Sequence, residues 1–142
     1  MPRDGRIRAS PLPPSPTLRF SFKHLDFNTE KFCVRNCDRE FWYNLHCRIY
    51  GYSRWTVDQF RDQNQNNQNM EHRHTIYFPE TSELGGFVNV DQENLALEEP
   101  WQFSVNPVPE CIGRVHGLLQ DDTFYVIWLD PCHRLYPKSF SC

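Results

Sequence analysis

The spacing of hydrophobic and polar residues predicts several short strands. Residues 18–27 (LRFSFKHLDF) begin with large apolar side chains alternating with polar ones, which is the period of a half-buried strand. The same alternation returns in residues 101–105 (WQFSV), where Asn106-Pro107 ends it. Residues 75–78 (TIYF) are long enough only for a short edge strand. We therefore expect strands well separated along the chain.

Between these strands the hydrophobic period becomes helical. Asp38 is a suitable N-cap, and Gly51 suits the position after a helix end. Thr56 and Gln59 have capping-box spacing, so a second short helix should start at Thr56. We expect an αα-hairpin. The apolar face of its first helix comprises Phe41, Trp42, Leu45 and Ile49.

The most regular segment predicts a β-hairpin near the C-terminus. Residues 112–120 and 123–130 should pair antiparallel around a two-residue turn at Asp121-Asp122. Alternation then sorts the side chains onto two faces, of which the more apolar should pack on the helices. That face holds Gly113, Val115, Gly117, Leu119, Phe124, Val126 and Trp128. The outer face holds Arg114, His116 and Leu118 opposite Leu129, Ile127 and Tyr125.

Together these elements predict one α+β domain over residues 18–142. Its small, mostly antiparallel sheet of three or four strands should pack on the αα-hairpin. Residues 1–17 contain five prolines and few large apolar groups, which favours a disordered Pro-rich tail. The amide-rich residues 62–74 and the acidic residues 79–99 are expected to be surface loops.

Composition narrows the class of protein. The net charge of −3 gives no overall attraction to nucleic acid, so such contact would need a local basic patch. We expect no membrane span and no secretory signal, because no apolar run is long enough for either. The six cysteines are then expected to be reduced thiols of a cytoplasmic protein, without a disulfide.

Groups able to bind phosphate and move protons gather at the end of the hairpin. The predicted register brings Arg114 and His116 close to the residues that follow the last strand. Arginine can bind a phosphate, and histidine or tyrosine can transfer protons. Alternatively, Asp130 bonds to Arg134 or Arg114 and only locks the strand end. The candidate catalytic residues are Arg114, His133, Arg134 and Tyr136.

Other groupings give weaker indications. Cysteine and histidine pairs occur, but none has the paired C-x2-C spacing of a structural zinc site, so we expect no metal. A nucleophilic Cys-His pair lacks any local sequence signature. His72-Arg73-His74 either contacts RNA or belongs to a solvated loop, and the loop interpretation is favoured.

Residues 113–136 (GRVHGLLQDDTFYVIWLDPCHRLY) resemble the C-terminal hairpin of the RelE/ParE-like toxin superfamily. In those toxins an arginine on the penultimate strand precedes a short hairpin, an apolar strand and a terminal cluster of His, Arg or Tyr. The expected order of one strand, two helices and three further strands is similar as well. The resemblance extends over residues 18–137 in topology.

The resemblance implies a ribosome-dependent mRNA endonuclease that needs no metal or other cofactor. Arg114 and Arg134 would stabilise the scissile phosphate, and His133 or Tyr136 would act as general acid or base. Implied partners are the ribosome with its mRNA and an antitoxin protein. Lys23, His24 and His116 would be substrate-binding residues.

The alternative is a non-catalytic protein-binding module, such as a phage or mobile-element inhibitor or a gyrase-binding ParE-like toxin. The chain is longer and more acidic than ribosome-binding toxins usually are. The geometry of the cluster distinguishes the nuclease from the binding module. A nuclease needs Arg114 and His133 or Tyr136 to converge on a solvent-open cleft, whereas a binding module would have them tied up or spread apart.

Overall fold

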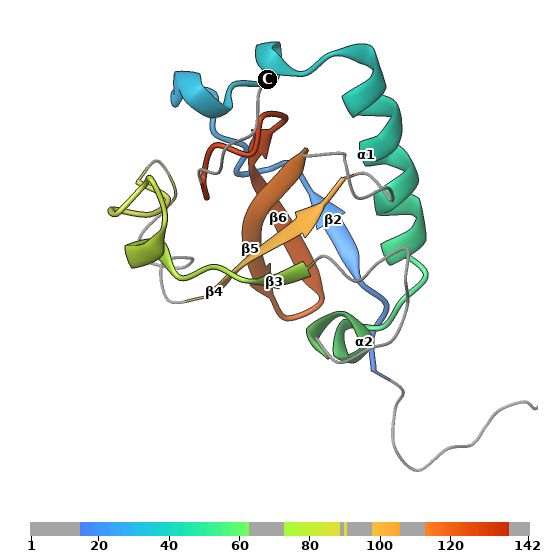
Figure 1. Cartoon of the computed structure of the whole chain (residues 1–142). Coiled ribbons are helices and arrows are strands. Elements are labelled where there is room, and N and C mark those ends of the chain that lie inside the picture. The colour runs from blue at the N-terminus through green and yellow to red at the C-terminus, as the bar shows by residue number, and fades with distance from the viewer. Residues whose placement is uncertain (1–14, 63–72, 89, 91–97, 106–112, 137–142) are drawn as a thin grey trace, which may run out of the picture.

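The computed structural model shows a five-stranded sheet with two α-helices (Figure 1). It describes residues 15–62, 73–88, 90, 98–105 and 113–136. The helices are α1 (Arg39–Tyr52) and α2 (Val57–Arg61), with short 3₁₀ helices η1 (Glu30–Phe32), η2 (Val34–Asn36) and η3 (Phe78–Glu80). The strands are β2 (Arg19–Ser21), β3 (Arg73–Thr75), β4 (Glu99–Ser104), β5 (Arg114–Gln120) and β6 (Thr123–Asp130).

The strand order is β2-β6-β5-β4-β3, with β2 parallel to β6 and the other pairs antiparallel. The α+β class is thus confirmed, but the expected sheet of three or four strands is wrong. Two three-residue strands, β2 and β3, extend the edges and make a mixed sheet of five. The strand expected within residues 18–27 is present as β2, and the short edge strand expected at residues 75–78 is present as β3, shifted toward the N-terminus.

The helix starts follow the expected caps. The Asp38 carboxylate accepts the Phe41 N–H at 2.8 Å, and both hydrogen bonds of the Thr56–Gln59 capping box are present. Helix α1 does not end before Gly51 but continues to Tyr52. Because α2 has only five residues, the expected αα-hairpin is in fact one long and one very short helix. No helix in the described part of the chain is long and apolar enough to cross a membrane.

The β5–β6 hairpin has the expected turn, and Gln120 pairs with Thr123. The register shifts, however, between His116 and Gly117, which marks a β-bulge. Ile127 and Trp128 consequently lie in the same hydrophobic cluster, and the expectation that Trp128 packs on the helices is wrong. A bulge inserts one residue and so exchanges the faces beyond it.

Both faces of the sheet are covered, so the expected half-exposed outer face does not exist. On the helix side the buried cluster comprises Leu18, Phe41, Leu45, Tyr52, Val57, Phe60, Trp101, Phe103, Val105, Val115, Leu119, Phe124, Val126 and Leu129. On the other side it comprises Phe32, Ile76, Phe87, Val90, Leu118, Ile127, Trp128 and Leu135. Segments around η1 and η3 supply this second cover.

Residues 15–17 of the expected disordered tail are attached to the fold. The Pro16 carbonyl accepts the Val57 N–H at 2.9 Å, and Thr17 forms an isolated bridge with Thr56. This places the end of the segment against the start of α2. The expectation for residues 1–14 lies outside the described residues.

Arg73 belongs to the core and not to a solvated loop. Its guanidinium donates to the Phe60 and Asp62 carbonyls at 2.9 and 2.6 Å, and it lies 4.8 Å from the centre of the Trp55 ring. These carbonyls end α2, where a cation offsets the helix dipole. The loop expectation fails here because Arg73 caps a helix end, while residues 63–72 lie outside the described part.

Candidate functional site

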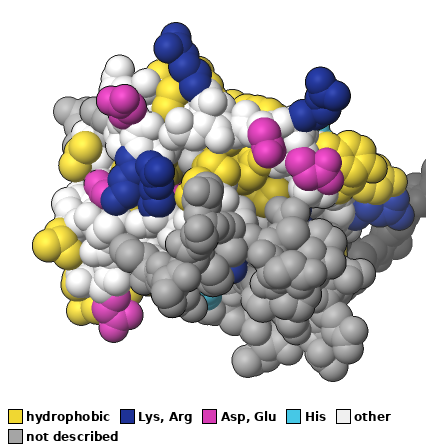
Figure 2. Space-filling view, turned by 45° about the horizontal axis from the view of Figure 1, so that its top comes forward, with side chains coloured by type: hydrophobic (Ala, Val, Ile, Leu, Met, Phe, Trp, Pro, Cys, Tyr) yellow, Lys and Arg dark blue, Asp and Glu magenta, His cyan; other side chains and the backbone are white. Residues whose placement is uncertain are grey.

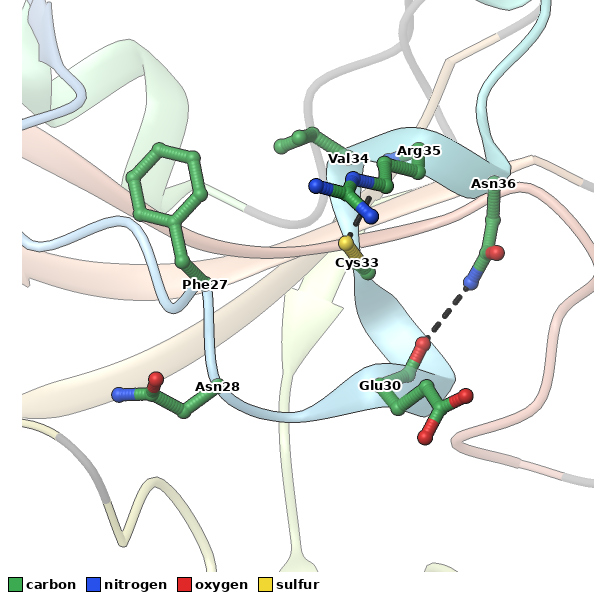
Figure 3. A pocket seen from close by; sticks show the side chains of 7 residues that line it. All are labelled: Phe27, Asn28, Glu30, Cys33, Val34, Arg35 and Asn36. Atoms are coloured by element: carbon green, nitrogen blue, oxygen red, sulfur yellow. Dashed lines mark hydrogen bonds between the residues drawn. The ribbon is translucent and has the colours of Figure 1, made fainter.

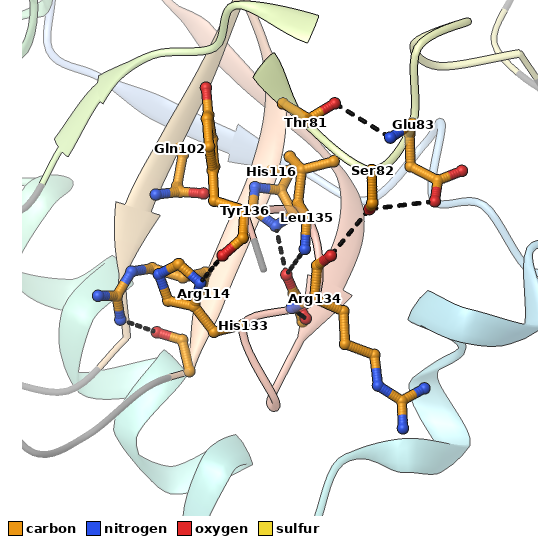
Figure 4. Close-up of polar contacts among 12 residues, drawn as sticks. Thr81, Ser82, Glu83, Gln102, Arg114, His116, His133, Arg134, Leu135 and Tyr136 are labelled. Atoms are coloured by element: carbon orange, nitrogen blue, oxygen red, sulfur yellow. Dashed lines mark hydrogen bonds and ion pairs between the residues drawn. The ribbon is translucent and has the colours of Figure 1, made fainter. Parts of the chain in front are cut away.

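Most of the candidate residues lie where β5 begins and β6 ends. Arg114 and His116 lie on β5, Asp130 ends β6, and His133 and Tyr136 follow it (Figure 4). His133 has a φ of 57°, so the chain turns back over the sheet directly after β6. The predicted proximity of Arg114 and His133 is therefore observed.

The centre of this cluster is a buried pair formed by His116 and Asp130. The His116 Nε2 lies 2.9 Å from Asp130 Oδ2, and the two side chains are 0% and 1% exposed. The same carboxylate accepts the backbone N–H groups of Arg134 at 2.7 Å and Leu135 at 3.0 Å. Asp130 thus holds the strand end and its following turn together.

The protonation states follow from this burial. Burial lowers the pKa of His116, although the hydrogen bond that His116 donates to Asp130 opposes the shift. Burial alone would raise the pKa of Asp130, but hydrogen bonds from His116 and two backbone N–H groups outweigh it and lower that pKa. We infer a neutral His116 that donates its Nε2–H to an ionised Asp130.

His133 is also buried, at 5% exposure. Its Nδ1 lies 2.9 Å from the Tyr136 carbonyl, so Nδ1 carries the proton. Burial, and then the nearby Arg114 cation, lower the pKa of His133. The Nδ1 of His133 is thus hydrogen-bonded to the backbone, and the lowered pKa keeps the imidazole neutral.

The other candidate side chains diverge. Arg114 donates to the Gly113 carbonyl at 3.0 Å, and the Tyr136 hydroxyl accepts the Tyr77 N–H at 3.0 Å. Arg134 is exposed, and its side chain extends away from Arg114 (Figure 4). The two arginines therefore do not form the joint phosphate site that the resemblance implied.

Two polar residues beside the cluster were not identified from the sequence. Gln102 on β4 pairs with His116, and its Nε2 lies 3.0 Å from the His74 Nε2. The described residues offer no hydrogen-bond partner to Gln102 Oε1 or His116 Nδ1. Alternation in residues 101–105 marks Gln102 as facing away from Trp101, but only the β4–β5 register shows that it meets His116.

Lys23 and His24 lie apart from this cluster. They follow β2, which is separated from β5 by β6. The His24 ring lies 5.0 Å from the Tyr125 ring, and Lys23 is exposed. The structure gives these two residues no place beside Arg114.

The cysteines depart from expectation at one position. Cys132 is disulfide-bonded, so the prediction of no disulfide is wrong there. Cys33, Cys37 and Cys47 are free, and burial raises the pKa of the Cys37 thiol to about 12, which makes it a poor nucleophile. Among the described residues no group of His, Cys, Asp or Glu is arranged to hold a metal ion.

Comparisons with protein-family models, curated proteins and solved structures give no match to this chain. Any assignment of function therefore rests on the geometry of the described residues. That geometry combines one buried histidine–carboxylate pair, a second buried histidine and two separated arginines.

The buried histidines predict an acid-sensitive fold. Since the pKa values of His116 and His133 are lowered in the folded protein, the unfolded chain binds more protons below its ordinary histidine pKa of 6.5. The free energy of unfolding should decline as the pH falls through that value, by up to about 1.4 kcal/mol per pH unit for each histidine. His133→Asn suits the positive φ and should reduce the slope measured by urea unfolding. An unchanged slope would contradict this account.

Proposed function

We propose that this chain is a non-catalytic protein-binding module that inhibits a partner protein by covering part of its surface. A phage or mobile-element inhibitor, or a toxin that binds its target without cutting it, works in this way. The observation that carries the proposal is the burial of both histidines of the cluster, His116 and the candidate general base His133, at 0% and 5% exposure.

The hydrogen bonds of the cluster support a structural role for these groups. His116 is committed to Asp130, His133 to the Tyr136 carbonyl, and the Tyr136 hydroxyl to the Tyr77 N–H. General acid–base catalysis requires a side chain within hydrogen-bond reach of the substrate proton. In this arrangement a substrate would first have to displace the turn that Asp130 anchors.

The order of the elements supports a RelE/ParE-like layout for the module. One strand precedes two helices, and an antiparallel series β3-β4-β5-β6 completes the sheet. A layout alone gives no activity, because one fold carries many functions. The proposed layout therefore rests on the order of the elements, and the proposed absence of catalysis rests on the buried cluster.

The endonuclease remains a second candidate because one observation favours it. Arg114 lies close enough to His133 to influence the pKa of the imidazole. Metal-independent cleavage of RNA through its 2'-hydroxyl needs a cation at the phosphate, a proton acceptor and a proton donor, and Arg114 and His133 would supply the first two. In this case the turn after β6 would have to open when the ribosome binds.

Expression in bacteria with mapping of mRNA 5' ends separates the two functions. We expect the wild type and Arg114→Ala to leave ribosome-bound mRNA uncut, and to affect growth equally. A nuclease would instead cut mRNA, and removal of a preorganised charge would slow it by on the order of 10²- to 10³-fold. His133→Asn, which keeps the backbone geometry, serves as the second variant. New mRNA ends that vanish in both variants would overturn the proposed function.

A further inference from the structure

Two adjoining pockets form a hollow on the surface beside η1 and η2. The larger, about 640 Å³, is lined by Phe27, Asn28, Glu30, Cys33, Val34, Arg35 and Asn36 (Figure 3). The smaller, about 210 Å³, is lined by Lys31, Asn36, Asp130, Pro131, Cys132 and Arg134. Asn36 lines both, so the pockets meet there.

The walls of the hollow are fixed in place before anything binds. The Asp26 carboxylate accepts the Asn28 N–H at 2.8 Å and the Trp128 indole N–H at 2.8 Å. The Asn36 amide donates to the Glu30 carbonyl at 3.0 Å, which ties η2 to η1. Below them the Phe32 ring stacks on Trp128, with centroids 4.5 Å apart. Such preorganisation lowers the entropy lost on binding.

The lining combines an apolar half with separate cations. Phe27 is 66% exposed and stands beside Val34 in the larger pocket. The side chains of Arg35 and Arg134 are exposed and form no ion pair with another described residue. Figure 2 shows the molecule with its upper end in Figure 1 turned forward, and there side chains of both charges, Lys and Arg as well as Asp and Glu, border hydrophobic surface.

We propose that this hollow docks an acidic polypeptide segment carrying one large apolar side chain. The apolar side chain would pack on Phe27 and Val34, and flanking carboxylates would pair with Arg35 and Arg134. A volume of about 640 Å³ is within the usual range of ligand pockets and is ample for one large side chain. Arginine binds carboxylates through two parallel hydrogen bonds, which fixes the orientation of the bound carboxylate. This inference rests on the proposed function, since it names the surface and the partner chemistry of the module.

Charge favours a polypeptide over a nucleic acid as the occupant. The Glu30 carboxylate lies within the larger pocket, where it would repel the closely spaced phosphates of a nucleic acid more than single carboxylates placed at Arg35 and Arg134. Asp130 lines the smaller pocket but is only 1% exposed, and three donors already engage it. The whole chain carries a net charge of −3, so it supplies no general attraction to any polyanion, and binding would depend on Arg35 and Arg134 themselves.

Selection from an unbiased random peptide library against the whole protein tests the docking site. Selected peptides should share Asp or Glu residues around one Phe, Trp, Leu or Met. Their affinity, measured by fluorescence anisotropy, should fall at least about 10-fold with Phe27→Ala and with each of the single variants Arg35→Glu and Arg134→Glu. Tyr50→Ala and Arg54→Glu are matched controls, because this exposed aromatic and cation lie at the far end of α1.

The controls should bind the selected peptides as tightly as the wild type. The docking proposal is overturned if no peptide is selected, if the consensus lacks acidic residues, or if hollow and control variants weaken binding equally. It is also overturned if a short single-stranded RNA binds the hollow and displaces the peptide. Uncut mRNA together with a failed peptide selection would remove only the docking site, whereas mRNA cleavage would remove the binding-module proposal itself.

Discussion

Replacing Asp130 with alanine is expected to lower the free energy of unfolding by about 3–5 kcal/mol. The carboxylate accepts hydrogen bonds from His116 and from the backbone of Arg134 and Leu135. All of these donors except the part-buried Arg134 N–H lie in buried surroundings, so its loss leaves them without a partner. Leaving a buried donor unsatisfied costs more than the bond itself contributes. Chemical denaturation of Asp130→Ala measures the effect.

The same substitution made in a His116→Leu variant measures the contribution of the His116–Asp130 pair. His116→Leu removes the main orphaned side-chain donor, so Asp130→Ala should cost at least about 1 kcal/mol less in that background. Asp58→Ala, at an exposed position on α2, is the control and should change stability by well under 1 kcal/mol. Equal losses from Asp130→Ala in both backgrounds would refute the proposed coupling with His116.

Local sequence signals identified the helix starts and the β5–β6 hairpin. Asp38, Thr56 and the Asp121-Asp122 turn act within three or four residues, so their effect can be read without knowing the fold. The edge strands β2 and β3 were expected near their positions, within residues 18–27 and 75–78, but their bounds and their places in the sheet could not be identified in this way. Each has three residues and exists because a neighbouring strand offers hydrogen bonds.

The candidate site was predicted in composition but not in environment. Alternation placed His116 on the face away from the helices, and it does lie there. That face was expected to be open, whereas η1 and the segment around η3 bury it. The hydrophobic pattern of a strand does not show that a segment far away in the sequence covers it. For the same reason the hollow beside η1 was not foreseen, since its lining joins residues 27–36 to residues 130–134.

Gly117 shows why the hairpin must bulge where it does. A Cβ added there would lie 2.1 Å from the Tyr125 carbonyl oxygen and 2.5 Å from a ring carbon of Phe124. The register shift lies between His116 and Gly117, and the missing side chain lets the Tyr125 carbonyl and the Phe124 ring approach β5 next to it. The shift places Ile127 and Trp128 in the same cluster.

Gly117→Ala is therefore expected to destabilise the fold by more than about 3 kcal/mol, above the usual range for an added methyl group. The first obstacle is a backbone oxygen of the central hairpin, which cannot move without breaking strand pairing. Gly85→Ala is the control, because its Cβ would come no closer than 3.4 Å to a Val88 methyl group. Urea unfolding compares the two variants. Equal stability of Gly117→Ala and the wild type would mean that the bulge and its close contact are absent in solution.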